Sequence, residues 1–199
     1  MFGRTAVVGL VSILVASIAH AGGECCKKAA AADAWCGDCK VGFVAGEEMK
    51  SQKLHDAMKG TEVKEAPKCA DCKGMAEKGG WCSKCNVGLV GGKSYKSKFA
   101  FVLARGMRVA VADVKCDACK KNLGGHGWCD ACKAGVVGNE VFKDKAQYDE
   151  AVKAHEVLET AIKASAKCDG CAVAMVSDGK CEPCKASFKD GKPVAAAKP

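Results

Sequence analysis

Amphipathic helices are predicted at three places along the chain. In residues 145–164 the side chains Tyr148, Val152, His155, Leu158 and Ile162 recur at steps of three or four, the period of one helix face. Residues 98–112 and 47–58 occupy the same place in earlier copies of a repeated pattern, and we expect them to be helical too. The apolar stripe of the 145–164 helix is expected to pack on the hairpin beside it.

A pair of short strands is predicted before each of these helices. The first strand has a central glycine in every copy: Val-Gly-Phe-Val, Val-Gly-Leu-Val and Ala-Gly-Val-Val. Glycine-containing turns at 91–92 and 138–139 precede a second short strand through Tyr95 or Phe142, as is typical of β-hairpins. A fourth copy stops after its hairpin, near Phe188.

Residues 1–21 have the pattern of a cleaved signal peptide. A cationic start with Arg4 precedes the nearly continuous apolar run 5–18, and the small residues Ala19 and Ala21 suit a cleavage site. The run is shorter than the roughly 20 residues of a membrane-spanning helix. We therefore expect an exported protein, periplasmic or secreted, with no transmembrane segment in the mature chain and a compartment that permits disulfides.

Sixteen cysteines define an internal repeat of four units. In three units a Cys-x-x-Cys pair is followed, after nine residues, by a second such pair. In the first unit the leading position of the first pair is Gly23, and two adjacent cysteines stand beside it instead. The predicted units are unit 1 (22–67), unit 2 (68–114), unit 3 (115–166) and unit 4 (167–199, truncated, with no helix after its hairpin).

The two cysteine pairs of a unit are predicted to form one four-sulfur metal site. Two Cys-x-x-Cys knuckles about nine residues apart can place four sulfurs at the corners of a tetrahedron, as in structural zinc sites. The gap inside each unit is always nine residues, whereas the gaps between units vary from 29 to 35, so the constant gap belongs inside a site. The candidate ligands are Cys25, Cys26, Cys36 and Cys39; Cys69, Cys72, Cys82 and Cys85; Cys116, Cys119, Cys129 and Cys132; and Cys168, Cys171, Cys181 and Cys184.

Each unit resembles a small four-cysteine zinc-ribbon module, by its cysteine spacing and the hairpin that follows. The resemblance implies an α+β fold: a tandem array of metal-stapled units, each with two cysteine knuckles, a β-hairpin and a linking helix. It implies up to four zinc ions with a structural role, because four protein ligands leave no open position for catalysis. In unit 1 the adjacent Cys25 and Cys26 cannot form the same knuckle, so that site could be three-coordinate, looser or disulfide-linked.

Other cysteine chemistries remain open. An even number of cysteines in an exported chain also suits a disulfide framework, although disulfides more often join distant segments. Trp35 to Cys39 resembles the Trp-Cys-Gly-x-Cys active site of thioredoxin-like proteins, but the preceding residues do not form a strand pattern. Haem attachment would need the Cys-x-x-Cys-Lys variant, and iron–sulfur clusters are disfavoured by export. His126 could replace a ligand of unit 3, but we expect an exposed loop residue.

Composition and charge narrow the function further. Lysine and arginine number 31 against 23 acidic residues, a formal charge of +8, yet the lysines are dispersed and form no basic stripe that would favour a nucleic-acid partner. Without Arg4 the mature chain carries +7; four zinc ions, each with four thiolates, would bring it to about −1. No catalytic motif is recognisable. We expect a non-catalytic binding or scaffold protein with a protein or cell-envelope partner, the alternative being a thiol redox or metal-buffering protein.

Overall fold

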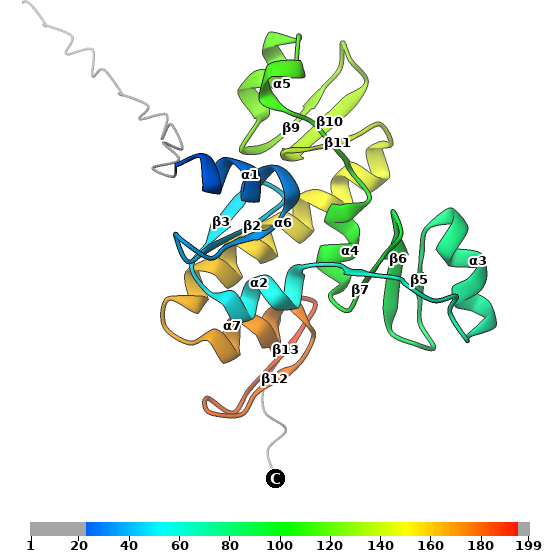
Figure 1. Ribbon diagram of the computed structural model, residues 1–199, viewed down its shortest axis with the longest axis vertical. Helices are drawn as coiled ribbons and strands as arrows, with labels where there is room; N and C mark the ends of the chain where they lie inside the picture. Colours follow the sequence, from blue (N-terminus) through cyan, green and yellow to red (C-terminus); the bar gives the residue numbers. More distant parts are fainter. Residues whose placement is uncertain (1–22, 195–199) are drawn as a thin grey trace, which may run out of the picture.

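The computed structural model describes residues 23–194, so the predicted signal peptide lies outside the described part (Figure 1). It is a mixed α+β structure in which four cysteine clusters recur along the chain. Each unit opens with a short helix, which the sequence did not predict: the first cysteine pair lies at the start of a helix instead of in a knuckle. These opening helices are α1 (Glu24–Ala32), α3 (Ala70–Lys78), α5 (Asp117–Asn122) and α7 (Asp169–Val176).

An antiparallel sheet follows each opening helix, and it contains the predicted hairpin. The first strand of each sheet ends at the leading cysteine of the second Cys-x-x-Cys pair. The tight turn that follows contains the other cysteine of that pair, and the two strands of the hairpin complete the sheet. The sheets are β1 (Trp35–Cys36), β2 (Val41–Val44) and β3 (Glu47–Met49); β5 (Gly80–Cys82), β6 (Val87–Val90) and β7 (Lys93–Tyr95); β9 (Gly125–Cys129), β10 (Ala134–Gly138) and β11 (Glu140–Phe142); and β12 (Lys180–Cys181), β13 (Ala186–Lys189) and β14 (Lys192–Val194).

The segments between units extend the sheets of units 2 and 3. β4 (Thr61–Glu62) pairs with β7, and β8 (Met107–Arg108) pairs with β11, so each of these sheets gains a fourth strand at its edge. The residues that link two units therefore become part of the next unit's fold.

Three linking helices follow the hairpins of units 1 to 3, as predicted, but two are shorter than expected. They are α2 (Gln52–Met58), α4 (Lys98–Ala104) and α6 (Lys145–Ser165). The prediction for 47–58 was wrong at its start, because Glu47–Met49 forms β3. The prediction for 98–112 was wrong at its end, because β8 follows soon after α4 and residues Val111–Asp113 form a separate 3-10 turn.

Capping side chains fix where the linking helices begin. The side-chain oxygens of Ser51, Ser97 and Asp144 each accept a hydrogen bond from the backbone N–H three residues further on. Such an N-cap satisfies one of the free backbone donors of the first turn and contributes about 1 kcal/mol. Helix formation in the three units therefore starts at equivalent positions.

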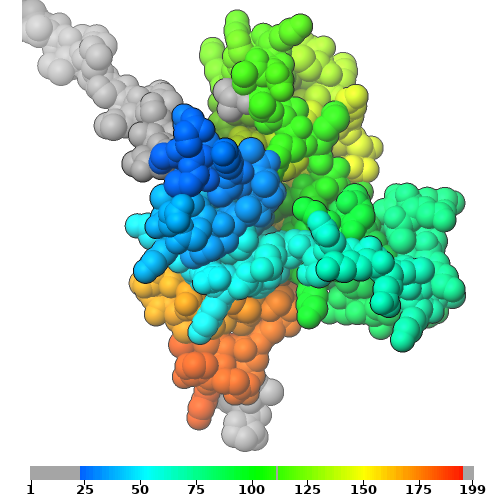
Figure 2. Space-filling model, in the orientation of Figure 1, coloured from blue at the N-terminus to red at the C-terminus, as the bar shows by residue number. Residues whose placement is uncertain are grey.

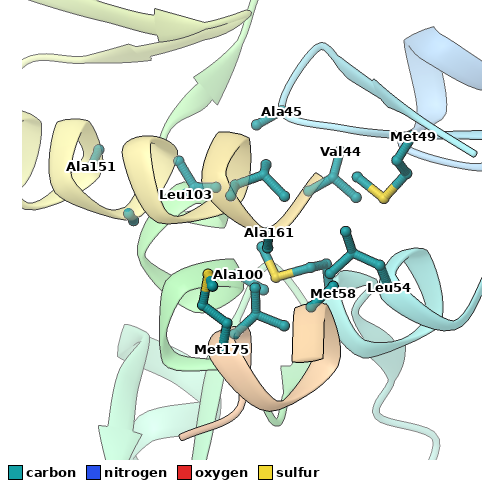
Figure 3. Packing of buried hydrophobic residues seen from close by; sticks show 14 of the residues in the cluster. Val44, Ala45, Met49, Leu54, Met58, Ala100, Leu103, Ala151, Ala161 and Met175 are labelled. Carbon is teal, nitrogen blue, oxygen red and sulfur yellow. The ribbon is translucent and has the colours of Figure 1, made fainter. Parts of the chain in front are cut away.

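The linking helices share a single core. α6 runs through the middle of the molecule, with α2, α4 and α7 against it (Figure 1). Leu54 of α2 and Leu103 of α4 point into this core (Figure 3). Leu158 of α6 belongs to the same cluster, so fully buried leucines from three different units share it. Burying one such side chain stabilises the fold by roughly 1.5–3 kcal/mol. The expectation that the α6 stripe packs on its own hairpin therefore holds only in part: Tyr148 covers β10, whereas Leu158 packs among helices.

The cysteine ends of units 1, 2 and 3 lie outside that core, each with a small apolar cluster of its own. In unit 2 the buried members are Cys72, Cys82 and Leu89, and in unit 3 they are Cys119, Cys129 and Val136. These two units project as separate lobes (Figure 2). In unit 4, by contrast, Cys181 belongs to the main core beside α7. Among residues 23–194, no helix combines the length and apolar character needed to cross a membrane.

A tryptophan, a glycine and a second ring pack together in each of the first three units. Trp81 lies 5.8 Å from Phe101 between ring centroids, and Gly88 of β6 leaves the space that the Phe101 ring occupies. Trp35 with His55 and Trp128 with Tyr148 repeat the arrangement at 5.7 and 5.5 Å. This contact joins each hairpin to its linking helix.

We predict that Gly88→Ala destabilises the protein by about 1–3 kcal/mol, because an added methyl group would overlap the Phe101 ring. Gly74→Ala is the matched control. Gly74 lies in helix α3 with open space around its Cα, so the same substitution is expected to raise stability by about 0.5–1 kcal/mol. Urea unfolding of the two variants checks both signs; equal effects would contradict the packing argument.

Arg108 joins units 1 and 3 by a charged network. Its guanidinium donates to Glu140 at 2.8 and 2.6 Å, to the Asp33 carboxylate, and to the carbonyl oxygen of Ala30 at the end of α1 at 3.1 Å. Burial raises the pKa of Glu140 to about 7, although Arg108 opposes the rise. Burial also raises the pKa of Asp33. The two carboxylates are tolerated in this partly buried place because Arg108 lies between them.

We predict that Arg108→Met lowers the free energy of unfolding by about 2 kcal/mol. This is less than the roughly 3–5 kcal/mol expected for a fully buried pair, because the Arg108 side chain is 27% exposed. Without Arg108 the pKa of Glu140 rises further above its unfolded value of about 4.3. The native state then binds a proton more tightly than the unfolded state does, so the free energy of unfolding falls as the pH rises. The loss should therefore be larger at pH 8 than at pH 5. Arg108→Lys, which keeps the charge, should show little of this pH dependence.

Candidate metal centres

The structure brings the four cysteines of every unit together, in the grouping predicted from the sequence. Within each cluster the four Sγ atoms lie within 4.8 Å of one another. The clusters are Cys25, Cys26, Cys36 and Cys39; Cys69, Cys72, Cys82 and Cys85; Cys116, Cys119, Cys129 and Cys132; and Cys168, Cys171, Cys181 and Cys184.

The sulfur spacing matches a tetrahedral metal site. The Sγ–Sγ distances are 3.6 Å for Cys25 and Cys39, 3.9 Å for Cys116 and Cys129, and 3.7 Å for Cys168 and Cys181. Four sulfurs bound at about 2.3 Å to a tetrahedral zinc ion are about 3.8 Å apart, whereas a disulfide bond is about 2.05 Å long. The four sulfurs of a cluster could therefore bind one metal ion with little movement of their side chains.

Two local structures carry the sulfurs of units 2, 3 and 4. In unit 2 the helical pair places Cys69 at the N-cap of α3 and Cys72 at its third residue. The other pair places the buried Cys82 at the end of β5 and the exposed Cys85 in the turn that follows. The next residue, Asn86, is left-handed with φ of 51° and sends the chain back into β6. One helix start and one tight turn thus face each other across the site.

Backbone N–H groups lower the pKa of one cysteine thiol in each of these units. The backbone N–H of Cys72 lowers the pKa of the Cys69 thiol to about 7, and the corresponding N–H groups do the same for Cys116 and Cys168. The helix N-terminus favours a thiolate at the N-cap for the same reason that it favours other anions. Burial and the neighbouring thiols raise the pKa of the second helical cysteine, for Cys119 to about 12. Metal binding must therefore displace protons from these deeper sulfurs.

Unit 1 reaches the same cluster with a shifted cysteine. Gly23 is the N-cap of α1 and Cys26 is its third residue, so Cys26 corresponds to Cys72. The missing N-cap sulfur is supplied by Cys25 at the second helical position, which still lies 3.6 Å from Cys39. The pKa of Cys25 is raised, first by the Cys39 thiol, instead of lowered. Unit 1 has all four sulfurs in place but lacks the thiolate that the N-cap stabilises elsewhere.

The thioredoxin-like motif at residues 35–39 and the histidines near the cysteine clusters do not form a thiol active site in the structure. Cys36 is buried at the end of β1, and β2 begins soon after Cys39, so the helix that follows this motif in thioredoxin-like proteins is not present there. His126 is exposed, on strand β9 instead of in a loop, and belongs to none of the cysteine clusters. His55 is buried under Trp35.

One cluster of possible metal ligands was not predicted from the sequence. Glu47, His155 and Glu159 come together between unit 1 and α6. The helical period placed His155 among apolar residues, and nothing in the sequence connects it with Glu47, 108 positions away.

Comparison with models of protein families, with curated proteins and with solved structures finds no match to this chain. What the clusters do must therefore be argued from their own geometry.

We predict that Cys82→Ser and Cys181→Ser each remove one metal site but differ in their effect on stability. Cys82 belongs to the small cluster of unit 2, whereas Cys181 belongs to the main core. Cys82→Ser should release the amides of β5 to β7 to rapid hydrogen exchange and shift the main thermal transition by less than about 2 °C. Cys181→Ser should lower that transition by more than about 5 °C, a loss of over 1 kcal/mol. A larger thermal shift for Cys82→Ser than for Cys181→Ser would contradict the separation of the lobes from the main core.

Proposed function

We propose that the protein is an exported, non-catalytic repeat protein whose four units each hold one structural zinc ion, and that it acts as a binding or scaffold module. The observation that carries the proposal is the closed four-sulfur cluster in every unit. A zinc ion with four protein ligands has no position left for substrate or water, so it stabilises a fold and does not catalyse a reaction.

The distribution of apolar residues supports the structural role of the metal. Unit 2 has one buried aliphatic residue, Leu89, in its own cluster, beside two cysteines. A lobe of this size cannot bury enough apolar surface to fix its backbone, and small domains of this kind use metals or disulfides instead. We therefore assign the zinc ions the task of holding the lobes in shape.

The partner proposed is a protein or another component of the cell envelope, not a nucleic acid. Arg105 and Arg108, the two arginines of the described chain, form ion pairs with acidic residues of the protein itself. The projecting lobes of units 2 and 3 give the surface a shape that can contact a partner at several points (Figure 2).

A metal-buffering or thiol redox role is the second candidate. It is favoured by two observations: the fourth cysteine of each cluster is exposed, and in three units the N-cap thiol has a pKa near 7. Exchange of metal or electrons through the exposed sulfurs would then be the function, and the fold a means of presenting them.

We predict that the exported chain begins at Gly22 and carries four zinc ions, with sixteen thiols that react only after chelation. N-terminal sequencing, elemental analysis and thiol titration before and after a chelator check these values. On native isoelectric focusing the loaded protein should run close to neutral and the chelated, reduced protein as a basic one, because each filled site adds a net charge of −2.

Three results would overturn the proposal. About eight disulfides without metal would indicate a disulfide framework. Reduction of insulin disulfides by the metal-free protein would indicate a redox enzyme. Transfer of most of the zinc to a competing thiolate peptide within seconds, with the lobes still folded, would indicate a metal buffer. Cys82→Ser serves as the control, with three zinc ions expected in place of four.

A further inference from the structure

A buried histidine between two carboxylates marks a fifth site of different chemistry. His155 lies on α6 with no exposed surface. Its Nε2 is 3.1 Å from Oε1 of Glu47 on β3, and its Nδ1 is 3.6 Å from Oε1 of Glu159, one turn further along α6. The ring therefore joins unit 1 to the central helix.

A neutral histidine cannot satisfy both neighbours. One ring nitrogen carries a proton and donates, and the other presents a lone pair. The 3.1 Å contact with Glu47 has hydrogen-bond length, so the proton belongs on Nε2. Nδ1 then presents its lone pair 3.6 Å from the Glu159 carboxylate, and it is a buried atom without a hydrogen-bond partner. A buried polar atom left without a partner is costly, and a cation between Nδ1 and the carboxylate would satisfy both.

No basic side chain supplies that charge. Within residues 23–194, neither Glu47 nor Glu159 forms an ion pair with a lysine or arginine. The ring is enclosed by two turns: Asn139 N–H donates to the Ala45 carbonyl at 3.2 Å, and a Cβ at Gly138 would lie 3.6 Å from Nε2. Glu159 is the more exposed of the two carboxylates, at 43% against 19% for Glu47.

We infer that Nδ1 of His155 and the Glu159 carboxylate bind a divalent transition-metal ion, with Glu47 holding the ring by accepting the Nε2–H bond. The 3.6 Å separation of Nδ1 and Oε1 is slightly longer than the roughly 3.0–3.4 Å between adjacent ligands bound at about 2.1 Å to one octahedral or tetrahedral ion, so a small movement of the Glu159 side chain would bring both atoms to bonding distance. A carboxylate on the second nitrogen of a ligating histidine is the usual means of orienting such a ring. Water on the Glu159 side would complete the coordination.

The ligand set distinguishes this site from the four cysteine clusters. Carboxylate oxygen and water suit harder ions such as Mn²⁺, which thiolates bind poorly. Mn²⁺ is therefore a probe that reports the fifth site while zinc occupies the sulfurs. Both proposed ligands lie on α6, and the hydrogen bond from His155 to Glu47 connects the ion to unit 1.

The test is a titration of the full chain with Mn²⁺ after the cysteine clusters have been loaded with zinc, followed by electron paramagnetic resonance. We expect one bound Mn²⁺ per chain. Glu159→Gln should weaken binding at least tenfold, and Glu47→Gln, which removes only the orienting carboxylate, by about tenfold. Glu156→Gln is the matched control, since Glu156 is exposed on the same helix and outside the group; it should bind as the wild type does.

Two outcomes would overturn the inference. One is no saturable Mn²⁺ binding by the wild type, which would leave a proton on Nδ1 as the positive charge. The other is equal binding by Glu159→Gln and Glu156→Gln. The zinc content, measured beforehand, tests the cysteine clusters separately, so failure of the fifth site and failure of the proposed zinc sites are distinguishable.

Discussion

The requirement that four sulfurs meet at one point governs the architecture of each unit. Two sulfurs come from a helix start and two from a strand end with its turn, so these two elements must face each other at a separation of about one sulfur–sulfur contact. The lobes have too few apolar residues to impose this arrangement. Fixing each backbone residue costs about 1–2 kcal/mol, whereas binding of a structural zinc ion releases roughly 10–16 kcal/mol. With zinc bound as we propose, the metal supplies the order that the apolar clusters of the lobes cannot.

A second constraint is the shared hydrophobic core, which prevents the units from folding as independent domains. The linking helices pack on their own hairpins, and they also collect around α6, where leucines from three units are buried together. Unit 4 has no linking helix among the described residues, and its opening helix α7 enters this core in its place. The result is a core held by ordinary hydrophobic packing, with cysteine lobes attached that depend on metal under the proposed zinc binding. Loss of metal should loosen the lobes of units 2 and 3 before it reaches α6.

The sequence predicted what is encoded locally. The constant nine-residue gap identified the right four cysteines for each cluster, and the glycine turns identified the hairpins. The opening helices were missed because a cysteine N-cap carries none of the usual capping signals, and α3 and α5 are short and mostly exposed. The start of α4 was predicted correctly, and the start of α2 was within reach, since Ser51 is an ordinary N-cap. Contacts such as Arg108 with Asp33, or His155 with Glu47, join distant segments and have no periodic signal.

Unit 1 shows which part of the cluster the chain must keep. Cys25 occupies a helical position that in unit 2 belongs to Asp71, yet its sulfur reaches the place that Cys69 fills there. The position of the sulfur in space is thus preserved, while its position relative to the helix start is not. What changes is the electrostatics: the backbone N–H groups lower the pKa of an N-cap thiol, whereas the neighbouring Cys39 thiol raises the pKa of Cys25. Four sulfurs in the right places define the site, and the helix dipole adjusts how readily one of them loses its proton.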